Sequence, residues 1–236
     1  MGLRTLQLTT TIVSQLELLR RVPLFSMLTT SQATTVADAV TKRRYKKGDV
    51  IVEQGKKSDA LTILLTGRAR VVSSNSRGRE VILAILQPGD YVGEMSLIDQ
   101  EPHSASVLAE VQTDVLTLSQ QEFSHCLPDS GSMAYAVLRG LVQRLRHADR
   151  KIESLALMDV YGRVAAVLME FAAENRSGGQ DNAVIARKVS RRDLAKMVGA
   201  SREMVSRVMK DLEERGFIQT QGDGSMLLKP NLDSLV

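Results

Sequence analysis

Length, composition and charge limit the classes of protein that this sequence can encode. With 236 residues the chain is long enough for one large domain or two smaller ones, and we expect two, each with its own core. Hydrophobic residues make up 43% and charged residues 25%, which excludes a disordered chain. The formal net charge of +4 is too small to indicate a nucleic-acid partner unless the charge is locally concentrated.

Membrane spans, secretory signals and metal centres are not predicted. No apolar run is long enough to cross a bilayer, and the first eleven residues lack a basic start followed by an apolar core. We therefore expect a cytoplasmic protein with no membrane partner. The single Cys126 cannot form an intrachain disulfide, hold an iron–sulfur cluster or complete a cysteine-rich zinc site. The three histidines lie on different predicted elements without ligand spacing, so we expect no metal.

The first half of the chain changes from helical to β-type patterns. Apolar residues have helical spacing in 12–28 and 31–40, with Pro23 as a break. From Tyr45 onward, short β-branched runs alternate with glycine-containing turns. The predicted strands are 50–54, 61–65, 69–74, 80–86 and 113–118. This pattern predicts an antiparallel β-roll or barrel.

A long helix is predicted after Pro128. Its apolar positions alternate spacings of four and three, which is the seam needed when two helices coil around each other. The seam consists of Ala134, Leu138, Leu141, Leu145, Ala148, Ile152 and Leu155. We predict a parallel homodimer; the alternative is an amphipathic helix packed on its own β-domain. A second helix is predicted at 159–173, and a loop follows it.

The last quarter of the chain has the pattern of a winged helix-turn-helix. Between residues 187 and 210 there are eight basic residues and two acidic ones. Ser190 begins one predicted helix, which ends at the turn 198–200, and Ser201 can cap a second helix. The predicted packed face of the second helix is Met204, Val205, Val208, Met209 and Leu212. The other face is Arg202, Glu203, Ser206, Arg207 and Lys210.

The second helix of such a pair enters the major groove of DNA, and strands at 217–221 and 225–229 would form the wing. Aromatic residues make up only 3% of the chain, so duplex DNA fits better than a single strand or an RNA loop.

The segment 201–207, followed by Leu212 and Glu213, resembles the recognition helix of the cyclic-AMP receptor protein and fumarate-nitrate regulator family. The resemblance extends through 155–160, Gly162 and Arg163 and through the β-roll, so it covers nearly the whole chain. It implies an α+β architecture: an N-terminal β-roll in 1–128, a dimerisation helix in 129–157 and a winged helix-turn-helix in 158–236. It also implies a transcription regulator, not an enzyme.

By this resemblance, the residues that contact the DNA bases are Arg202, Glu203 and Arg207. The expected DNA site is a palindrome with half-sites similar to TGTGA. The chemistry agrees, because arginine donates twice to guanine and glutamate accepts from cytosine N4. Contacts to the DNA backbone are expected from Arg191, Arg192, Ser201, Ser206 and Lys210. The loop at 175–183 is a possible contact for RNA polymerase by the same resemblance.

Residues 89–97 and 102–106 resemble the phosphate-binding cassette of cyclic-nucleotide domains. The effector residues expected there are Gly93, Glu94, Met95, Ser96, His103 and Ser104. Gly93 lets backbone approach a ligand, and Glu94 can accept a hydrogen bond from a ribose hydroxyl. His103 stands where cyclic-AMP-binding members have an arginine, and Ala148 and Asp149 stand where those members have the hydroxyl pair that contacts adenine. Strong cyclic-AMP binding is therefore not expected.

A guanine ligand fits the long helix better. The carboxylate of Asp149 can accept from the two N–H donors of guanine, and Arg146 with Asp149 has the R-x-x-D form of motifs that bind cyclic di-GMP. Some members of the resembled family respond to that dinucleotide. Cyclic di-GMP is thus the leading nucleotide effector, with Arg146, Asp149 and Arg150 as helix contacts. A surface ion pair, a cyclic-AMP response, a degenerate pocket without ligand and an enzyme acting on cyclic nucleotides remain as alternatives.

Overall fold

The computed structural model describes residues 22, 25, 29–57, 59–126, 131–174, 183–185, 189–222 and 225–235. They belong to two compact units, Met1–Arg144 and Leu145–Val236. The predicted helix at 12–28 lies outside the described residues except for Val22 and Phe25, and so does most of the loop at 175–183. No helix in the described ranges is long and apolar enough to cross a membrane.

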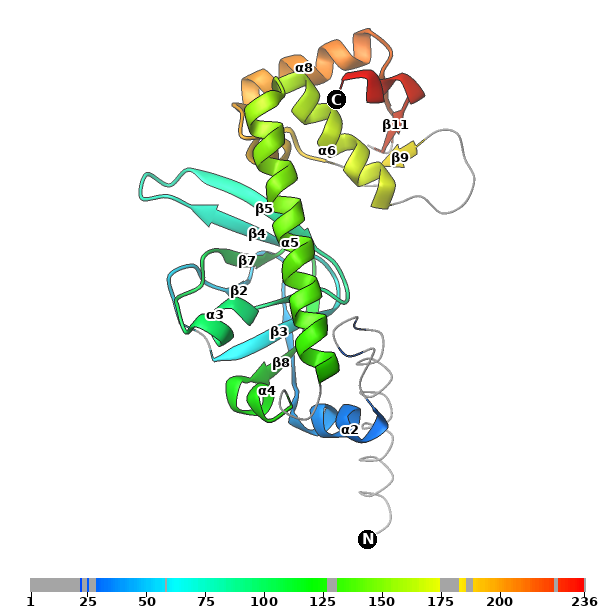
Figure 1. The fold of residues 1–236 in the computed structure, drawn as a ribbon. Helices are drawn as coiled ribbons and strands as arrows, with labels where there is room; N and C mark the ends of the chain where they lie inside the picture. The colour runs from blue at the N-terminus through cyan, green and yellow to red at the C-terminus, as the bar shows by residue number, and fades with distance from the viewer. Residues whose placement is uncertain are drawn as a thin grey trace. The chain divides into compact units, whose positions relative to one another are not determined.

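The first unit is built on two four-stranded antiparallel sheets (Figure 1). One sheet has the order β1 (Thr41–Tyr45), β8 (Thr113–Ser119), β3 (Ala60–Thr66) and β6 (Tyr91–Val92). The other has the order β2 (Val50–Val52), β7 (Ser106–Ala109), β4 (Ala69–Ser74) and β5 (Glu80–Leu86). The predicted β-roll is confirmed, and all five predicted strands are present.

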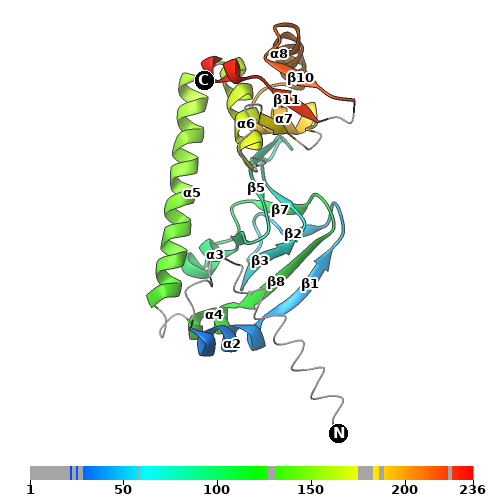
Figure 2. The ribbon, with the colours of Figure 1, turned by 90° about the vertical axis from the view of Figure 1, so that its right-hand side faces the viewer.

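The central strands β3 and β8 are buried on both faces. Because side chains alternate along a strand, Leu61 and Ile63 of β3 pack in one apolar cluster and Leu64 packs in another. The first cluster also contains residues of α2 (Thr30–Ala39) and α4 (Gln120–Cys126), two helices that contact each other beside the strands (Figure 2). The second cluster lies between the two sheets. The apolar run of β3 follows from this double burial.

The second unit is a winged helix-turn-helix, as predicted. Its helices are α6 (Val160–Glu174), α7 (Arg191–Val198), α8 (Arg202–Glu214) and the short 3-10 helix η2 (Pro230–Leu235). Its antiparallel sheet has the order β10 (Ile218–Thr220), β11 (Met226–Leu228) and β9 (Ala183–Ile185). Leu168, Leu194 and Val208, from α6, α7 and α8, are fully buried in its core.

The long helix α5 (Gly131–Leu157) contributes to both units. Val137 is buried and Leu141 packs against the β-roll core, whereas Leu138, Val142 and Leu145 are about half exposed or more. Leu141, one of the predicted seam residues, therefore also contacts the chain's own β-roll core, while the seam itself stays a prediction. The sequence pattern could not reveal this, because α5 carries apolar residues on two faces and periodicity does not say which face meets the chain's own domain.

Candidate functional site

Two capped helices and a tight turn position the helix α8. The hydroxyl of Ser190 accepts a hydrogen bond from the Asp193 N–H at 3.0 Å and begins α7, and that of Ser201 accepts from the Met204 N–H at 3.2 Å and begins α8. Between them, Gly199 adopts φ 65°, a left-handed conformation that ends α7 at little steric cost. The turn between α7 and α8 thus depends on Gly199, which ends α7, and on Ser201, which begins α8.

The helix α8 buries one face and exposes the other. Val205, Val208, Met209 and Leu212 are fully buried. Arg202, Glu203, Ser206, Arg207 and Lys210 are exposed. Met204 was predicted on the packed face, but it is 40% exposed. It lies about 90° around the helix from the centre of the buried face, so it sits at the margin of the two faces.

The exposed face of α8 presents charges suited to base edges. Neither Arg202 nor Arg207 forms a salt bridge with another residue that the structure describes, so both guanidinium groups are available to a ligand. The backbone N–H of Glu203 itself, and then the Ser201 hydroxyl, stabilise the Glu203 carboxylate and lower its pKa. Glu203 is therefore ionised at neutral pH and can only accept hydrogen bonds.

Other basic groups around α8 have acidic partners on the same unit. Arg191 lies 3.6 Å from Glu213, and Lys210 lies 3.5 Å from Glu214. Both contacts are on the surface and contribute little to stability, so they leave these side chains able to turn toward a DNA phosphate.

In the first unit, a glycine directs a glutamate into the interior. Gly93 has φ 94°, and an added Cβ would lie 2.6 Å from the carbonyl oxygen of Ala60, so only glycine fits. The helix α3 (Glu94–Asp99) follows, and the Glu94 side chain is 1% exposed. Burial raises the pKa of Glu94, although the nearby Arg144 opposes that shift.

Arg144 of α5 holds this glutamate. Its guanidinium donates to Glu94 Oε1 at 2.5 Å and also to the carbonyl oxygen of Tyr91, and it lies 5.0 Å from the centroid of the Tyr91 ring. Gly140, one turn earlier on α5, faces the same ring, since an added Cβ would overlap the Tyr91 hydroxyl at 1.9 Å. The ring is thus enclosed between Arg144 and Gly140.

Three buried polar atoms near this ion pair have no hydrogen-bond partner within the described ranges: Tyr91 OH, Glu94 Oε2 and His103 Nε2. The other ring nitrogen of His103 is 2.9 Å from the Ser96 hydroxyl. Burial lowers the pKa of His103. Because buried polar groups are nearly always paired, these atoms can accept or donate hydrogen bonds to a bound ligand or a buried water molecule.

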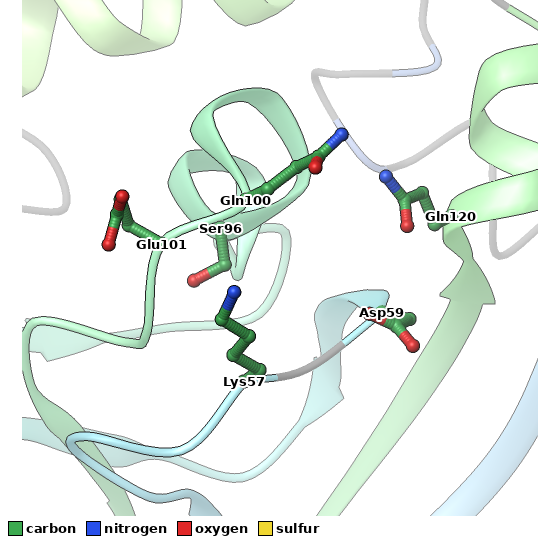
Figure 3. A pocket seen from close by; sticks show the side chains of 6 residues that line it. All are labelled: Lys57, Asp59, Ser96, Gln100, Glu101 and Gln120. Carbon is green, nitrogen blue, oxygen red and sulfur yellow. The ribbon is translucent and has the colours of Figure 1, made fainter.

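A polar hollow of about 140 Å³ adjoins this site and shares Ser96 with it (Figure 3). It is lined by Lys57, Asp59, Ser96, Gln100, Glu101 and Gln120. The hollow does not include the unpaired atoms, which are closed off from solvent. Beside them, the Arg144 side chain is 41% exposed, whereas its partner Glu94 is 1% exposed.

Comparison with known proteins identifies the two domains that carry these sites. A family model for the cyclic nucleotide-binding domain matches residues 42–130, and one for the Crp-like helix-turn-helix domain matches residues 162–235. The cAMP-activated global transcriptional regulator Vfr of Pseudomonas aeruginosa is 31% identical over 77% of this chain and 86% of its own length. The chain belongs to the Crp family of transcription regulators. It is therefore a DNA-binding regulator with a cyclic nucleotide-binding domain, as the resemblance of α8 implied.

Other relatives of this Crp-type regulator differ in their effectors. The CRP-like cAMP-activated global transcriptional regulator of Mycobacterium tuberculosis is 26% identical over 89% of this chain and 94% of its own length. The structure of CLP, the c-di-GMP responsive global regulator of Xanthomonas campestris, has a TM-score of 0.74 and 25% identity, covering 85% of this chain and 99% of CLP. Family membership alone therefore does not choose the nucleotide.

The structure of this Crp-type regulator gathers part of the predicted effector set. Gly93, Glu94, Ser96 and His103 lie at one buried site, whereas Met95 is 50% exposed and Ser104 is exposed. Arg146, Asp149 and Arg150 are exposed on the part of α5 that belongs to the second unit. The buried site belongs to the first unit, so these three residues stay predicted effector contacts.

Sequence reasoning missed Tyr91 and Arg144, although both belong to the buried site. The available signal was the pair Arg144 and Arg146 on one helix. Residues two apart point about 200° away from each other, so only one of them can face the β-roll. The position of Leu141, three residues before Arg144, identifies which one.

Proposed function

We propose that this Crp-type regulator is a homodimer that binds palindromic DNA with half-sites similar to TGTGA, under the control of a nucleotide second messenger. Cyclic di-GMP is the leading effector. The exposed face of α8 carries the first part of the proposal, because Arg202, Glu203 and Arg207 stand together at the N-terminal end of a capped helix that follows a tight turn. In a helix-turn-helix these are the positions that reach base edges.

The exposed apolar side chains of α5 support the homodimer. Leu138, Val142, Leu145 and Ile152 are 60%, 49%, 62% and 66% exposed, and their spacings of four, three and seven residues keep them on one stripe. Full burial of one such side chain stabilises by about 1.5–3 kcal/mol. A second copy of α5 is the natural partner, since a twofold axis presents the same stripe from both chains.

The unpaired atoms of the β-roll support a nucleotide effector. An ionised Glu94 offers a free acceptor at Oε2, which suits a ribose hydroxyl, and His103 Nε2 offers a group for a phosphate oxygen. Arg144 forms an ion pair with Glu94 in the structure and can exchange this ion pair for a contact with the ligand. Such an exchange would couple effector binding to α5, the helix on which both the dimer stripe and Arg144 lie.

The choice of cyclic di-GMP is supported by Asp149 and Arg146. Both are exposed on α5, so their acceptor and donor groups are available to a guanine base. The c-di-GMP responsive regulator CLP shares the fold over 85% of this chain. The cAMP-activated relatives favour the alternative nucleotide, but here Ala148 and Asp149 replace the hydroxyl pair that the resemblance associates with adenine.

The proposal also includes a contact between RNA polymerase and the loop at 175–183. Only Ala183 of this loop belongs to the described residues. The contact is proposed on family resemblance alone.

Operator binding at one fixed salt concentration tests the proposal, because phosphate contacts make DNA affinity salt-dependent. A palindrome with two TGTGA-like half-sites would be titrated by fluorescence anisotropy without nucleotide and with cyclic AMP, cyclic GMP or cyclic di-GMP. We expect a change of affinity with cyclic di-GMP only. Asp149→Ala should remove that response, and Glu153→Ala, which removes another exposed carboxylate of α5, should retain it.

Two other outcomes would overturn the effector assignment. A response to cyclic AMP alone would make that nucleotide the effector. Tight specific binding that no nucleotide changes would favour a ligand-independent regulator with a degenerate pocket. Failure to prefer the palindrome over a scrambled duplex would contradict the assignment of Arg202, Glu203 and Arg207 to base reading.

A further inference from the structure

The backbone of His103 is fixed by hydrogen bonds, and one nitrogen of its buried ring contacts Ser96. His103 is only 8% exposed and lies between α3 and β7. Its backbone N–H donates to Lys56 O at 3.0 Å, and its carbonyl accepts from the Gly55 N–H at 2.8 Å. Ser96 Oγ lies 2.9 Å from Nδ1. These contacts leave Nε2 as the one polar atom of the ring that is buried without a partner among the described residues.

Ser96 is a partner that suits both protonation states of the ring. When the neutral imidazole carries its hydrogen on Nε2, the Ser96 hydroxyl donates to Nδ1, and when the imidazole is protonated, the same hydroxyl accepts from Nδ1–H. In both of these states Nε2 carries a hydrogen and can donate to a ligand. Protonation of His103 therefore breaks no contact, and it adds a positive charge at the unpaired atom.

Apart from Lys57, the described cations around His103 already have acidic partners. The Glu94 carboxylate from α3 faces the Arg144 guanidinium from α5 at 2.5 Å. Lys56 pairs with Glu53 at 2.7 Å, and Lys57 and Glu101 line the exposed hollow beside Ser96. Burial lowers the pKa of His103, so the ring is neutral at neutral pH when no anion lies beside it.

We propose that His103 Nε2 donates the hydrogen bond to the phosphate group of the effector and that His103 takes up a proton when this phosphate binds. The proposal rests on the proposed function, in which the β-roll binds a nucleotide. It names the phosphate-binding group of that site and makes effector binding depend on pH. The phosphate stays chemically unchanged; a proton moves from solvent to the imidazole.

The direction of the pH dependence follows from linkage. A bound phosphate anion favours the imidazolium, so the pKa of His103 is higher in the complex than in the free protein. Effector affinity is then greatest below the free-state pKa and decreases as the pH rises through the bound-state pKa. Each unit by which binding raises this pKa corresponds to about a tenfold change in affinity.

Isothermal titration calorimetry on the full-length protein tests the inference, with cyclic di-GMP and cyclic AMP as probes. Titrations at about pH 5.5, 6.5 and 7.5 should show affinity decreasing by about tenfold over this range. Repeating them in two buffers of different ionisation enthalpy measures proton uptake directly. His103→Arg should bind without this pH dependence, because arginine stays protonated, and His103→Gln should bind weakly at every pH.

His147→Gln is the matched control, because this histidine belongs to the second unit and is part exposed. The variant should keep the wild-type pH dependence. A pH titration of the unsubstituted protein, followed by the NMR ring signals of its three histidines, measures the pKa of each ring with and without nucleotide. This measurement does not depend on the folding of the His103 variants.

Binding with equal affinity across the pH range, or a wild-type pH dependence in His103→Arg, would overturn this inference and leave the nucleotide effector standing. Absence of binding by both nucleotides at every pH would overturn the inference together with the proposed effector.

Discussion

The three proposed base-reading residues differ in how they can recognise DNA. Arg207 lies one and a half turns into α8 on its exposed face, and its side chain presents two parallel donors that match guanine O6 and N7. Glu203 has its pKa lowered by its own N–H and by Ser201, so it accepts but does not donate. A base pair read by Glu203 must therefore offer a donor, which is the amino group of cytosine.

We predict that Arg207→Ala weakens binding to the specific palindrome by about 1–3 kcal/mol and relaxes the preference for it, because a bidentate contact to guanine is lost. Arg192→Ala is the comparison. Arg192 is exposed on α7, and its expected partner is a phosphate, so its loss should weaken binding to specific and scrambled duplexes by similar factors. Anisotropy titrations on both duplexes distinguish the two effects. Unchanged specificity in Arg207→Ala would show that α8 docks in another register.

A site residue could be predicted from the sequence when its neighbours along the chain determine its position, and could not when its partner lies far away in the sequence. Arg202, Glu203 and Arg207 belong to a helix whose cap, turn and packed face are all visible within fifteen residues, and the structure exposes them together. Arg144 meets Glu94 across fifty positions of the chain. No local pattern marks such a pair, because its geometry depends on where α5 crosses the β-roll.

At the scale of elements, the same distinction explains why β1 was not among the predicted strands. The strand β1 reads Thr-Lys-Arg-Arg-Tyr, with four exposed residues and no apolar alternation. It forms because it pairs with β8, where Lys42 and Arg44 meet Asp114 at 3.1 and 2.6 Å. These cations, with the Arg44 hydrogen bond as the largest cause, lower the pKa of Asp114 to about 2. Pairing with the distant strand β8 therefore stabilises β1, whose own sequence lacks the apolar alternation of a strand.

The contact between α5 and β6 offers a prediction at this scale. Gly140 leaves space for the Tyr91 hydroxyl, and an added methyl group would lie 1.9 Å from it. Gly140→Ala should therefore displace the Tyr91 ring or α5, and we expect a loss of about 1–3 kcal/mol in the free energy of unfolding. The ring also lies under Arg144, so the response of operator binding to nucleotide should weaken.

Denaturant unfolding and nucleotide titration measure the two effects. Gly222→Ala is the control, since no residue in the described part of the chain lies within 4 Å of the added carbon at that position, and it should leave both quantities near wild type. A Gly140→Ala protein as stable as wild type, with an unchanged nucleotide response, would mean that the Tyr91 ring has another favourable position.

At the scale of the whole molecule, the proposed activity depends on two copies of the chain. A palindromic site offers two equivalent half-sites about one helical turn apart, and a single α8 can read only one of them. Ligand control then requires that nucleotide and DNA favour the same state of the dimer, because coupling between two binding sites is reciprocal. The exposed stripe of α5 is the surface from which such a dimer would be built.

We predict that Leu145→Glu abolishes the dimer at micromolar concentration and with it tight operator binding. Leu145 is 62% exposed in the single chain, and burial of such a side chain contributes about 1.5–3 kcal/mol per copy. In a twofold interface each substitution occurs twice, and each one also places a charge in an apolar contact. The dissociation constant of the dimer should therefore rise by at least about a hundredfold. Analytical ultracentrifugation measures the association, and anisotropy measures operator binding.

Val111→Glu is the matched control, because Val111 is an exposed apolar residue, at 40%, that lies in the turn between β7 and β8 and not on α5. It should remain dimeric and bind the operator. Circular dichroism of both variants checks that each is folded. If Leu145→Glu sedimented as a dimer and bound the palindrome like wild type, the α5 stripe would not be the interface, and another surface would have to bring the two α8 helices together.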